Sequence, residues 1–116
     1  MNVKILKSKI HRATVTLSEL HYVGSIGIDE DLMDAANLFN YEKVHVFNIN
    51  NGERFETYAI KEPRGSGTIG VYGAAARRVA VGDLVIVVAY ASMSPEEARN
   101  FQPAIAIPDA KNHLKK

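Results

Sequence analysis

Two Gly-Ser steps, Gly24-Ser25 and Gly65-Ser66, offer the most distinctive chemistry in this sequence. Glycine tolerates strained backbone conformations, and the hydroxyl of the next serine can approach the carbonyl carbon before it. Attack by that hydroxyl would turn the peptide bond into an ester. Elimination would then release the upstream chain and leave dehydroalanine, which hydrolyses to a pyruvoyl group. The alternative at both steps is an ordinary turn, because Gly-Ser is common in turns.

Other familiar catalytic constellations are missing from the sequence. Cysteine is absent, which excludes disulfides, thiolate zinc sites and cysteine nucleophiles. The histidines are scattered, and no pair has the spacing of a metal site on one helix. Neither a Gly-x-x-x-x-Gly-Lys loop nor a Gly-x-Ser-x-Gly motif occurs. We therefore expect no metal site, and any enzyme chemistry must use another reactive group.

The segments that would position these residues are predicted to be mainly short strands. Asn50-Asn51-Gly52 stands between two β-prone runs, which is the pattern of a β-hairpin. The apolar run 84–90 shows no polar alternation, so it predicts a strand buried on both faces. Many short strands with few helices favour a small closed barrel.

Helices are expected to be few and short. Acidic residues from Asp29 begin one helix, whose apolar face includes Leu32 and Phe39. Ser94, followed by proline, begins a second helix, and a third follows Gly73. The basic segment 111–116 is expected to be a solvated tail, with contact to an anion or a nucleic acid as the alternative.

Length and charge are those of one ordinary globular domain. The chain has 116 residues, and 14 basic against 13 acidic side chains leave a net charge of +1. This balance argues against a dedicated nucleic-acid binder. The longest apolar run, 84–91, is far shorter than the roughly 20 residues of a membrane span, and no signal-peptide core is visible. We therefore expect a cytoplasmic protein without a membrane or nucleic-acid partner.

Several motifs resemble, in order and spacing, the aspartate 1-decarboxylase family of pyruvoyl enzymes. The first comprises His11-Arg12 and Leu20-His21-Tyr22-x-Gly24-Ser25-x-x-Ile28-Asp29. The others are Asn51-Gly52-x-Arg54-Phe55-x-Thr57-Tyr58-Ala59-Ile60, Arg64-Gly65-Ser66, Gly73-Ala74-Ala75-Ala76, Val81-Gly82-Asp83 and Pro95-Glu96-Glu97-Ala98-Arg99. Together they extend from near the N-terminus to about residue 103, which is nearly the whole chain.

The resemblance implies a mainly β fold, a small double-psi β-barrel with a few short helices. It implies a homotetramer with active sites between subunits, and one domain over residues 1–116. It also implies an inactive precursor that cleaves itself at Gly24-Ser25 into residues 1–24 and 25–116. The larger chain then begins with a covalent pyruvoyl group derived from Ser25, so neither a metal nor pyridoxal phosphate is needed. Ser66 matches a turn position in the family.

The family's substrate is L-aspartate, and its product, β-alanine, serves pantothenate and coenzyme A biosynthesis. By the resemblance, the pyruvoyl group from Ser25 forms a Schiff base with the substrate, and Tyr58 is the proton donor. Arg54, whose planar guanidinium suits a carboxylate, and Lys9 are expected to bind the substrate. The other expected substrate-binding residues are Thr57, Gly73, Ala74 and Ala75.

The sequence departs from the family at Tyr72, where Asn is common in the pocket, and at Phe47, which replaces a frequent Trp. Two other functions stay open at this point. One is a non-enzymatic β-barrel that binds a partner, which predicts an intact chain. The other is a pyruvoyl decarboxylase for a different amino acid, against which a cationic pocket around Arg54 favours an acidic substrate.

Overall fold

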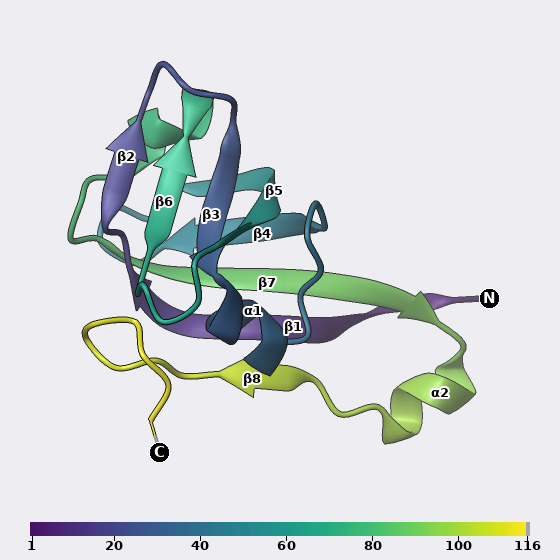
Figure 1. The fold of residues 1–116 in the computed structure, drawn as a ribbon. Helices are drawn as coiled ribbons and strands as arrows, with labels where there is room; N and C mark the ends of the chain where they lie inside the picture. The colour runs from purple at the N-terminus through teal and green to yellow at the C-terminus, as the bar shows by residue number, and fades with distance from the viewer. Residues whose placement is uncertain (116) are drawn as a thin grey trace.

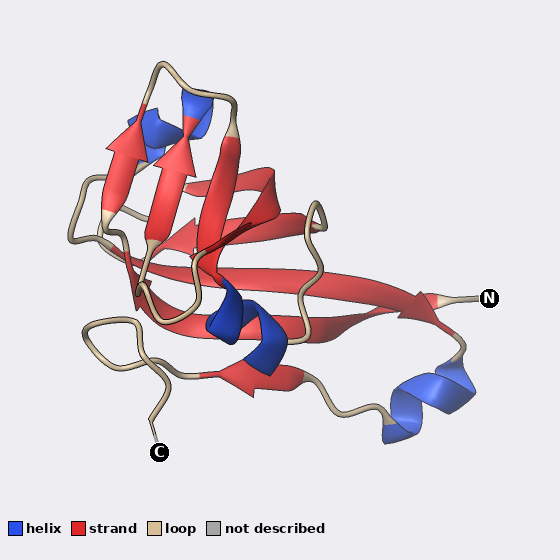
Figure 2. Ribbon diagram, in the orientation of Figure 1, coloured by secondary structure: helices blue, strands red, loops and turns tan. Residues whose placement is uncertain are grey.

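Strands make up most of the structure, a computed structural model that describes residues 1–115 (Figure 1; Figure 2). The eight strands are β1 (Val3–Thr14), β2 (Leu17–Glu19), β3 (Ser25–Asp29), β4 (Lys43–Asn48), β5 (Arg54–Glu62), β6 (Ile69–Tyr72), β7 (Leu84–Met93) and β8 (Ala104–Ala106). The helical segments are α1 (Glu30–Ala35), the 3-10 helix η1 (Gly73–Arg78) and α2 (Pro95–Asn100). The predicted mainly β fold with a few short helices is confirmed.

The strands join in the order β2-β6-β3-β5-β4-β7-β1-β8, and β5 forms the bend. The first half of β5, Arg54 to Tyr58, pairs antiparallel with β4. Its second half, Ala59 to Glu62, pairs parallel with β3. As a result β2, β6 and β3 stand steeply against the long strands β7 and β1 (Figure 1). This order is compatible with the double-psi β-barrel that the resemblance implies.

The core lies between the two parts of this bent sheet. Alternate residues of a strand face opposite sides, and one side of β3 and β7 is fully buried at Ile26, Ile28, Val85 and Val87. The prediction of burial on both faces of 84–90 is correct only for the middle of β7, since Tyr90 is exposed.

Two of the helices begin as the sequence predicts. The Asp29 carboxylate accepts a hydrogen bond from the Asp31 amide at the start of α1, and the Ser94 hydroxyl accepts one from the Glu97 amide at the start of α2. The predicted extension of the first helix to Phe39 is wrong. The chain turns at Asn37, whose φ is 56°, so Phe39 lies outside α1 and is exposed.

The hairpin between β4 and β5 is confirmed, with Gly52 at a positive φ of 77°. The expected solvated C-terminal tail is wrong at Asn112, which is buried. Its amide nitrogen donates to the carbonyl oxygens of Thr14 and Gly67, and its amide oxygen accepts from the Thr14 N–H. Residue 116 of that segment lies outside the described residues. No helix within residues 1–115 is long and apolar enough to span a membrane.

Candidate active site

Ser25 begins β3 and is almost completely buried, with 2% of its surface exposed. Tyr72 lies directly opposite it in the antiparallel pairing of β3 with β6. On the other side of β3, Ile26 pairs with Ala59, so Ser25 lies next to Tyr58, one residue earlier on each strand. Cross-strand neighbours share a face of the sheet. Ser25 is therefore flanked by Tyr58 and Tyr72, on the face opposite to the core side chain of Ile26.

The Gly24–Ser25 peptide bond is held against the start of η1. Gly73 has a positive φ of 74°, and a Cβ at this residue would lie 2.6 Å from Gly24 Cα. Only glycine allows this close approach of the two backbones. The Ser25 hydroxyl donates to the Val23 carbonyl at 3.4 Å.

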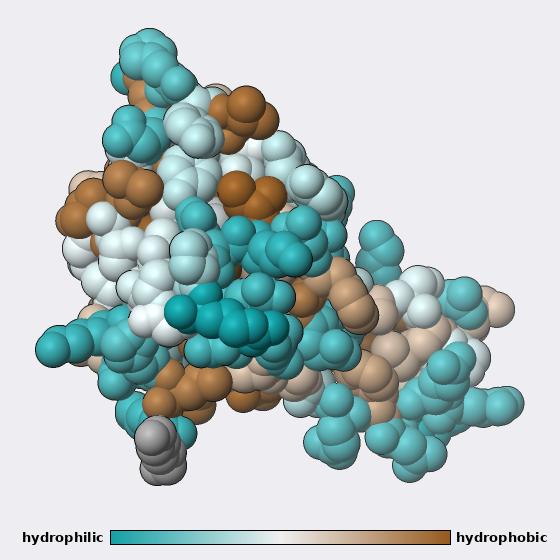
Figure 3. Space-filling view, viewed as in Figure 1, coloured by the Kyte–Doolittle hydropathy of each residue, from teal (hydrophilic) through white to brown (hydrophobic). Residues whose placement is uncertain are grey.

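The chain before Gly24 reaches the surface. Val23 and Tyr22 are 73% and 65% exposed, and apolar side chains reach the surface at the end of the molecule formed by β2, β6 and β3 (Figure 3). The scissile bond predicted from the sequence thus joins an exposed loop to a buried strand.

The two tyrosines beside Ser25 differ in their hydrogen bonding. The Tyr72 hydroxyl donates to the Glu62 carboxylate at 2.5 Å. Burial, and then this hydrogen bond, raise the pKa of Tyr72 above its usual value. The Tyr58 hydroxyl makes no hydrogen bond within residues 1–115, and its ring packs 6.2 Å from that of Tyr41. Of the two hydroxyls beside Ser25, that of Tyr58 is therefore the one without a protein partner in the described part of the chain.

Arg54 and Lys9 lie away from Ser25 within one chain. The Arg54 guanidinium lies 3.9 Å from the centre of the Phe47 ring, on β4, and β4 is on the opposite side of β5 from β3. Four residues along β5 also separate Arg54 from Tyr58, which corresponds to about 13 Å. Lys9 pairs with Val88 across β1 and β7, and three strands separate β1 from β3.

The remaining predicted site residues divide between two places. Gly73 and the adjoining Ala74 and Ala75 lie in η1 beside Gly24. Thr57 pairs with the buried Val44, and strand alternation places it on the opposite face of β5 from Tyr58. One chain therefore brings Ser25 together with Tyr58 and the start of η1, but not with Lys9 or Arg54.

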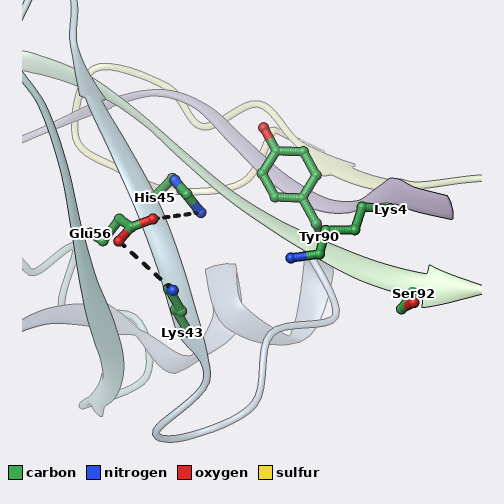
Figure 4. A pocket seen from close by; sticks show the side chains of 6 residues that line it. All are labelled: Lys4, Lys43, His45, Glu56, Tyr90 and Ser92. Atoms are coloured by element: carbon green, nitrogen blue, oxygen red, sulfur yellow. Dashed lines mark ion pairs between the residues drawn. The ribbon is translucent and has the colours of Figure 1, made fainter. Parts of the chain in front are cut away.

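A hollow lies on the same sheet face as Arg54 and is lined by residues of β1, β4, β5 and β7 (Figure 4). Glu56 pairs there with His45 at 3.4 Å and with Lys43 at 3.8 Å, and the Tyr90 and His45 rings form a T-shaped pair with centroids 5.5 Å apart. This hollow could not be predicted from the sequence, because its residues come from four strands. Its full lining is Lys4, Lys43, His45, Glu56, Tyr90 and Ser92.

Glu62 is a further residue whose place beside the site could not be predicted from the sequence. It has no neighbour in the sequence that suggests a role, and it lies beside Tyr72 only through the pairing of three strands. The unusual Tyr72 was the one available signal. Together, the fold and the site define a small, mainly β protein with a buried serine that follows a glycine and stands between two tyrosines.

Comparison with known proteins gives the family. Residues 1–115 match the model of the family described as aspartate decarboxylase. A protein of Cytophaga hutchinsonii named aspartate 1-decarboxylase is 61% identical over 114 residues, which cover 98% of this chain and 99% of that protein. Proteins of the same name from Phocaeicola vulgatus and Caldicellulosiruptor saccharolyticus are 58% and 59% identical, over 95% and 100% of this chain and 95% and 91% of their own lengths. The chain belongs to the aspartate decarboxylase family.

This membership makes the chain an enzyme, so the alternative of a non-enzymatic β-barrel is wrong. The resemblance noted in the sequence is confirmed over almost the whole chain.

Proposed function

We propose that this enzyme decarboxylates L-aspartate to β-alanine and CO₂, for pantothenate and coenzyme A biosynthesis in the cytoplasm. Its reactive group is a pyruvoyl made from Ser25. The observation that carries this proposal is the placement of Ser25, buried beside Tyr58 with Gly24 pressed against Gly73. The names of the similar proteins support the same substrate.

Self-cleavage uses only groups of the chain and water. The Ser25 hydroxyl attacks the Gly24 carbonyl carbon, the C–N bond breaks, and an ester forms on Oγ. Loss of the Ser25 Cα proton with rupture of the Cβ–Oγ bond releases residues 1–24 with a carboxyl group at Gly24. Elimination leaves dehydroalanine at residue 25. Water then hydrolyses it, which releases its nitrogen as ammonia and leaves a ketone at the start of residues 25–116. Gly24 suits this sequence because it has no side chain to block the approach of the hydroxyl.

The surroundings of Ser25 fit such a group. When present, a pyruvoyl supplies an electrophilic ketone that accepts the substrate amine and withdraws electrons as CO₂ leaves. Tyr58, next to Ser25, returns a proton to the substrate carbon. Arg54 and Lys9 hold the side-chain carboxylate of aspartate. Thr57 and the segment 73–75 complete substrate binding.

An active site shared between subunits would allow Arg54 and Lys9 to bind the substrate although both lie away from Ser25 within one chain. Arg54 lies over Phe47 on the far side of β5 from Ser25, so we propose that it serves the Ser25 of a neighbouring subunit. The hollow in Figure 4 lies on the same strands as Arg54 and Lys9, so this face would meet that neighbour. The proposed assembly is a homotetramer.

Substrate capture tests the proposed function. Borohydride added with L-aspartate should attach the substrate covalently to the fragment 25–116, as seen by mass spectrometry. L-Glutamate and L-alanine under the same conditions should give little product. Turnover of another amino acid faster than aspartate would instead support the remaining alternative, a pyruvoyl decarboxylase of different specificity.

Arg54→Ala should raise KM for aspartate strongly and lower kcat little, measured on the cleaved fraction only. Loss of a desolvated partner for the substrate carboxylate costs roughly 2–5 kcal/mol. Arg99→Ala, which removes an exposed arginine of α2, is the matched control and should behave like the parent.

Co-expression tests whether the site is shared. A Ser25→Ala chain keeps Arg54 but lacks the reactive group, whereas an Arg54→Ala chain has the opposite defect. Mixed assemblies should be more active with dilute aspartate than either variant alone, and light scattering should show tetramers. An active monomer, or no gain on mixing, would contradict the shared site.

A further inference from the structure

Tyr72, at the position where the family commonly has Asn, makes a contact that crosses β3. Its hydroxyl donates to Glu62 Oε2 at 2.5 Å. Glu62 ends β5 and Tyr72 ends β6, and β3 lies between them in the sheet. Glu62 therefore reaches over the strand that begins with Ser25.

Two glycines make room for this contact. A Cβ at Gly27 would clash with the Glu62 carboxylate, and a Cβ at Gly70 would clash with the Tyr72 hydroxyl. Gly27 and Gly70 are direct partners across β3 and β6. The sheet beneath the Glu62–Tyr72 contact thus has no side chain at this point of either β3 or β6.

The contact fixes the side chain that packs on the cleavage segment. The Tyr72 ring lies against the Tyr22 ring, with centroids 5.2 Å apart. The Tyr72 backbone pairs with Ser25, and the next residue, Gly73, lies against Gly24. Tyr22, Gly24 and Ser25 therefore each contact Tyr72 or its neighbour Gly73.

Without Glu62, the largely buried Tyr72 hydroxyl would lose its acceptor. The hydrogen bond to Glu62 anchors the Tyr72 ring over Gly70, so loss of either partner would release the ring from its place against Tyr22. We propose that Glu62 is a positioning residue for self-cleavage, which acts through Tyr72 to hold the segment 22–25 in its reactive conformation. This inference rests on the proposed cleavage at Gly24–Ser25.

The role is one of positioning, because the Tyr72 hydroxyl does not face the bond that breaks. The hydroxyl lies over Gly70, whereas the Tyr72 backbone, two residues further along β6, is what pairs with Ser25. Glu62 and Tyr72 thus act on the reaction only through the conformation of the chain around Gly24.

The test follows cleavage of freshly purified precursor by intact-mass spectrometry. Glu62→Ala should slow cleavage roughly 10- to 100-fold, the scale expected when reacting atoms lose alignment. Tyr72→Phe should slow it similarly, and the double variant should be no slower than either single one, because both remove one contact. Glu62→Gln keeps an acceptor for the hydroxyl and should restore most of the rate.

Glu42→Ala is the matched control for lost stability. Glu42 is also a half-buried glutamate, but it pairs with Lys7 and accepts from the Phe39 amide, away from the cleavage segment. Its variant should have a lower melting temperature yet cleave at the parent rate.

A second measurement does not depend on cleavage. In a Ser25→Ala background, where every chain stays intact, the melting temperatures of Glu62→Ala, Tyr72→Phe and the double variant should be non-additive. Additive shifts would mean that the contact is absent and would overturn the inference. Non-additive shifts with cleavage at the parent rate would overturn the positioning role. A parent chain that never cleaves would refute the proposed function itself, and the inference with it.

Discussion

The Ser25→Ala chain should remain a single polypeptide of 116 residues and should have no measurable decarboxylase activity. Alanine has no hydroxyl to attack the Gly24 carbonyl, so neither the ester nor the ketone can form. Intact-mass spectrometry and CO₂ release from L-aspartate measure the two effects. Because the methyl group of alanine fits the buried start of β3, the variant should fold.

Ser66→Ala is the matched control, since Gly65-Ser66 is the other Gly-Ser step. Ser66 lies in an exposed turn, where its hydroxyl accepts from the Thr68 amide at 3.3 Å. This variant should cleave and turn over like the parent. Efficient cleavage of the Ser25→Ala chain after residue 24 would show that Ser25 is not the residue that attacks the peptide bond.

Tyr58→Phe should lower kcat by roughly 10²–10⁴-fold, the usual contribution of a positioned general acid. The substitution keeps the ring and removes only the hydroxyl next to Ser25. Cleavage and covalent capture of aspartate by borohydride should therefore persist, and KM should change little. The contrast with Arg54→Ala, which mainly raises KM, separates proton transfer from substrate binding.

Tyr41→Phe controls for the loss of a hydroxyl in the same neighbourhood. Its ring packs 6.2 Å from that of Tyr58, but the residue is exposed, so kcat should be unchanged. If fully cleaved Tyr58→Phe decarboxylates aspartate at the parent rate, the proton comes from another group or from water.

Local sequence signals predicted the elements well. The hairpin at Asn51-Gly52 and the helix start at Ser94 depend on residues close together in the chain, and both are correct. The helix from Asp29 ends earlier than its apolar face predicts, because the chain turns at Asn37, a residue type that often takes a positive φ at helix ends.

Contacts between distant segments were not predictable in this way. Asn112 is buried against Thr14, 98 residues earlier in the chain. The residues next to Asn112 in the sequence are mostly basic and indicate only a solvated tail. The Glu62–Tyr72 contact requires the register of three strands and the absence of side chains at Gly27 and Gly70. Likewise, the separation of Arg54 from Ser25 follows from the strand order, which no local pattern contains.

Denaturing mass spectrometry of the purified parent chain shows directly whether the chain cleaves itself at Gly24–Ser25. Two species are expected, residues 1–24 and residues 25–116. The larger should be blocked to Edman sequencing and lighter, by the mass of one ammonia molecule, than a chain that begins with serine. A single intact species of 12.8 kDa in a preparation that decarboxylates L-aspartate would contradict self-cleavage.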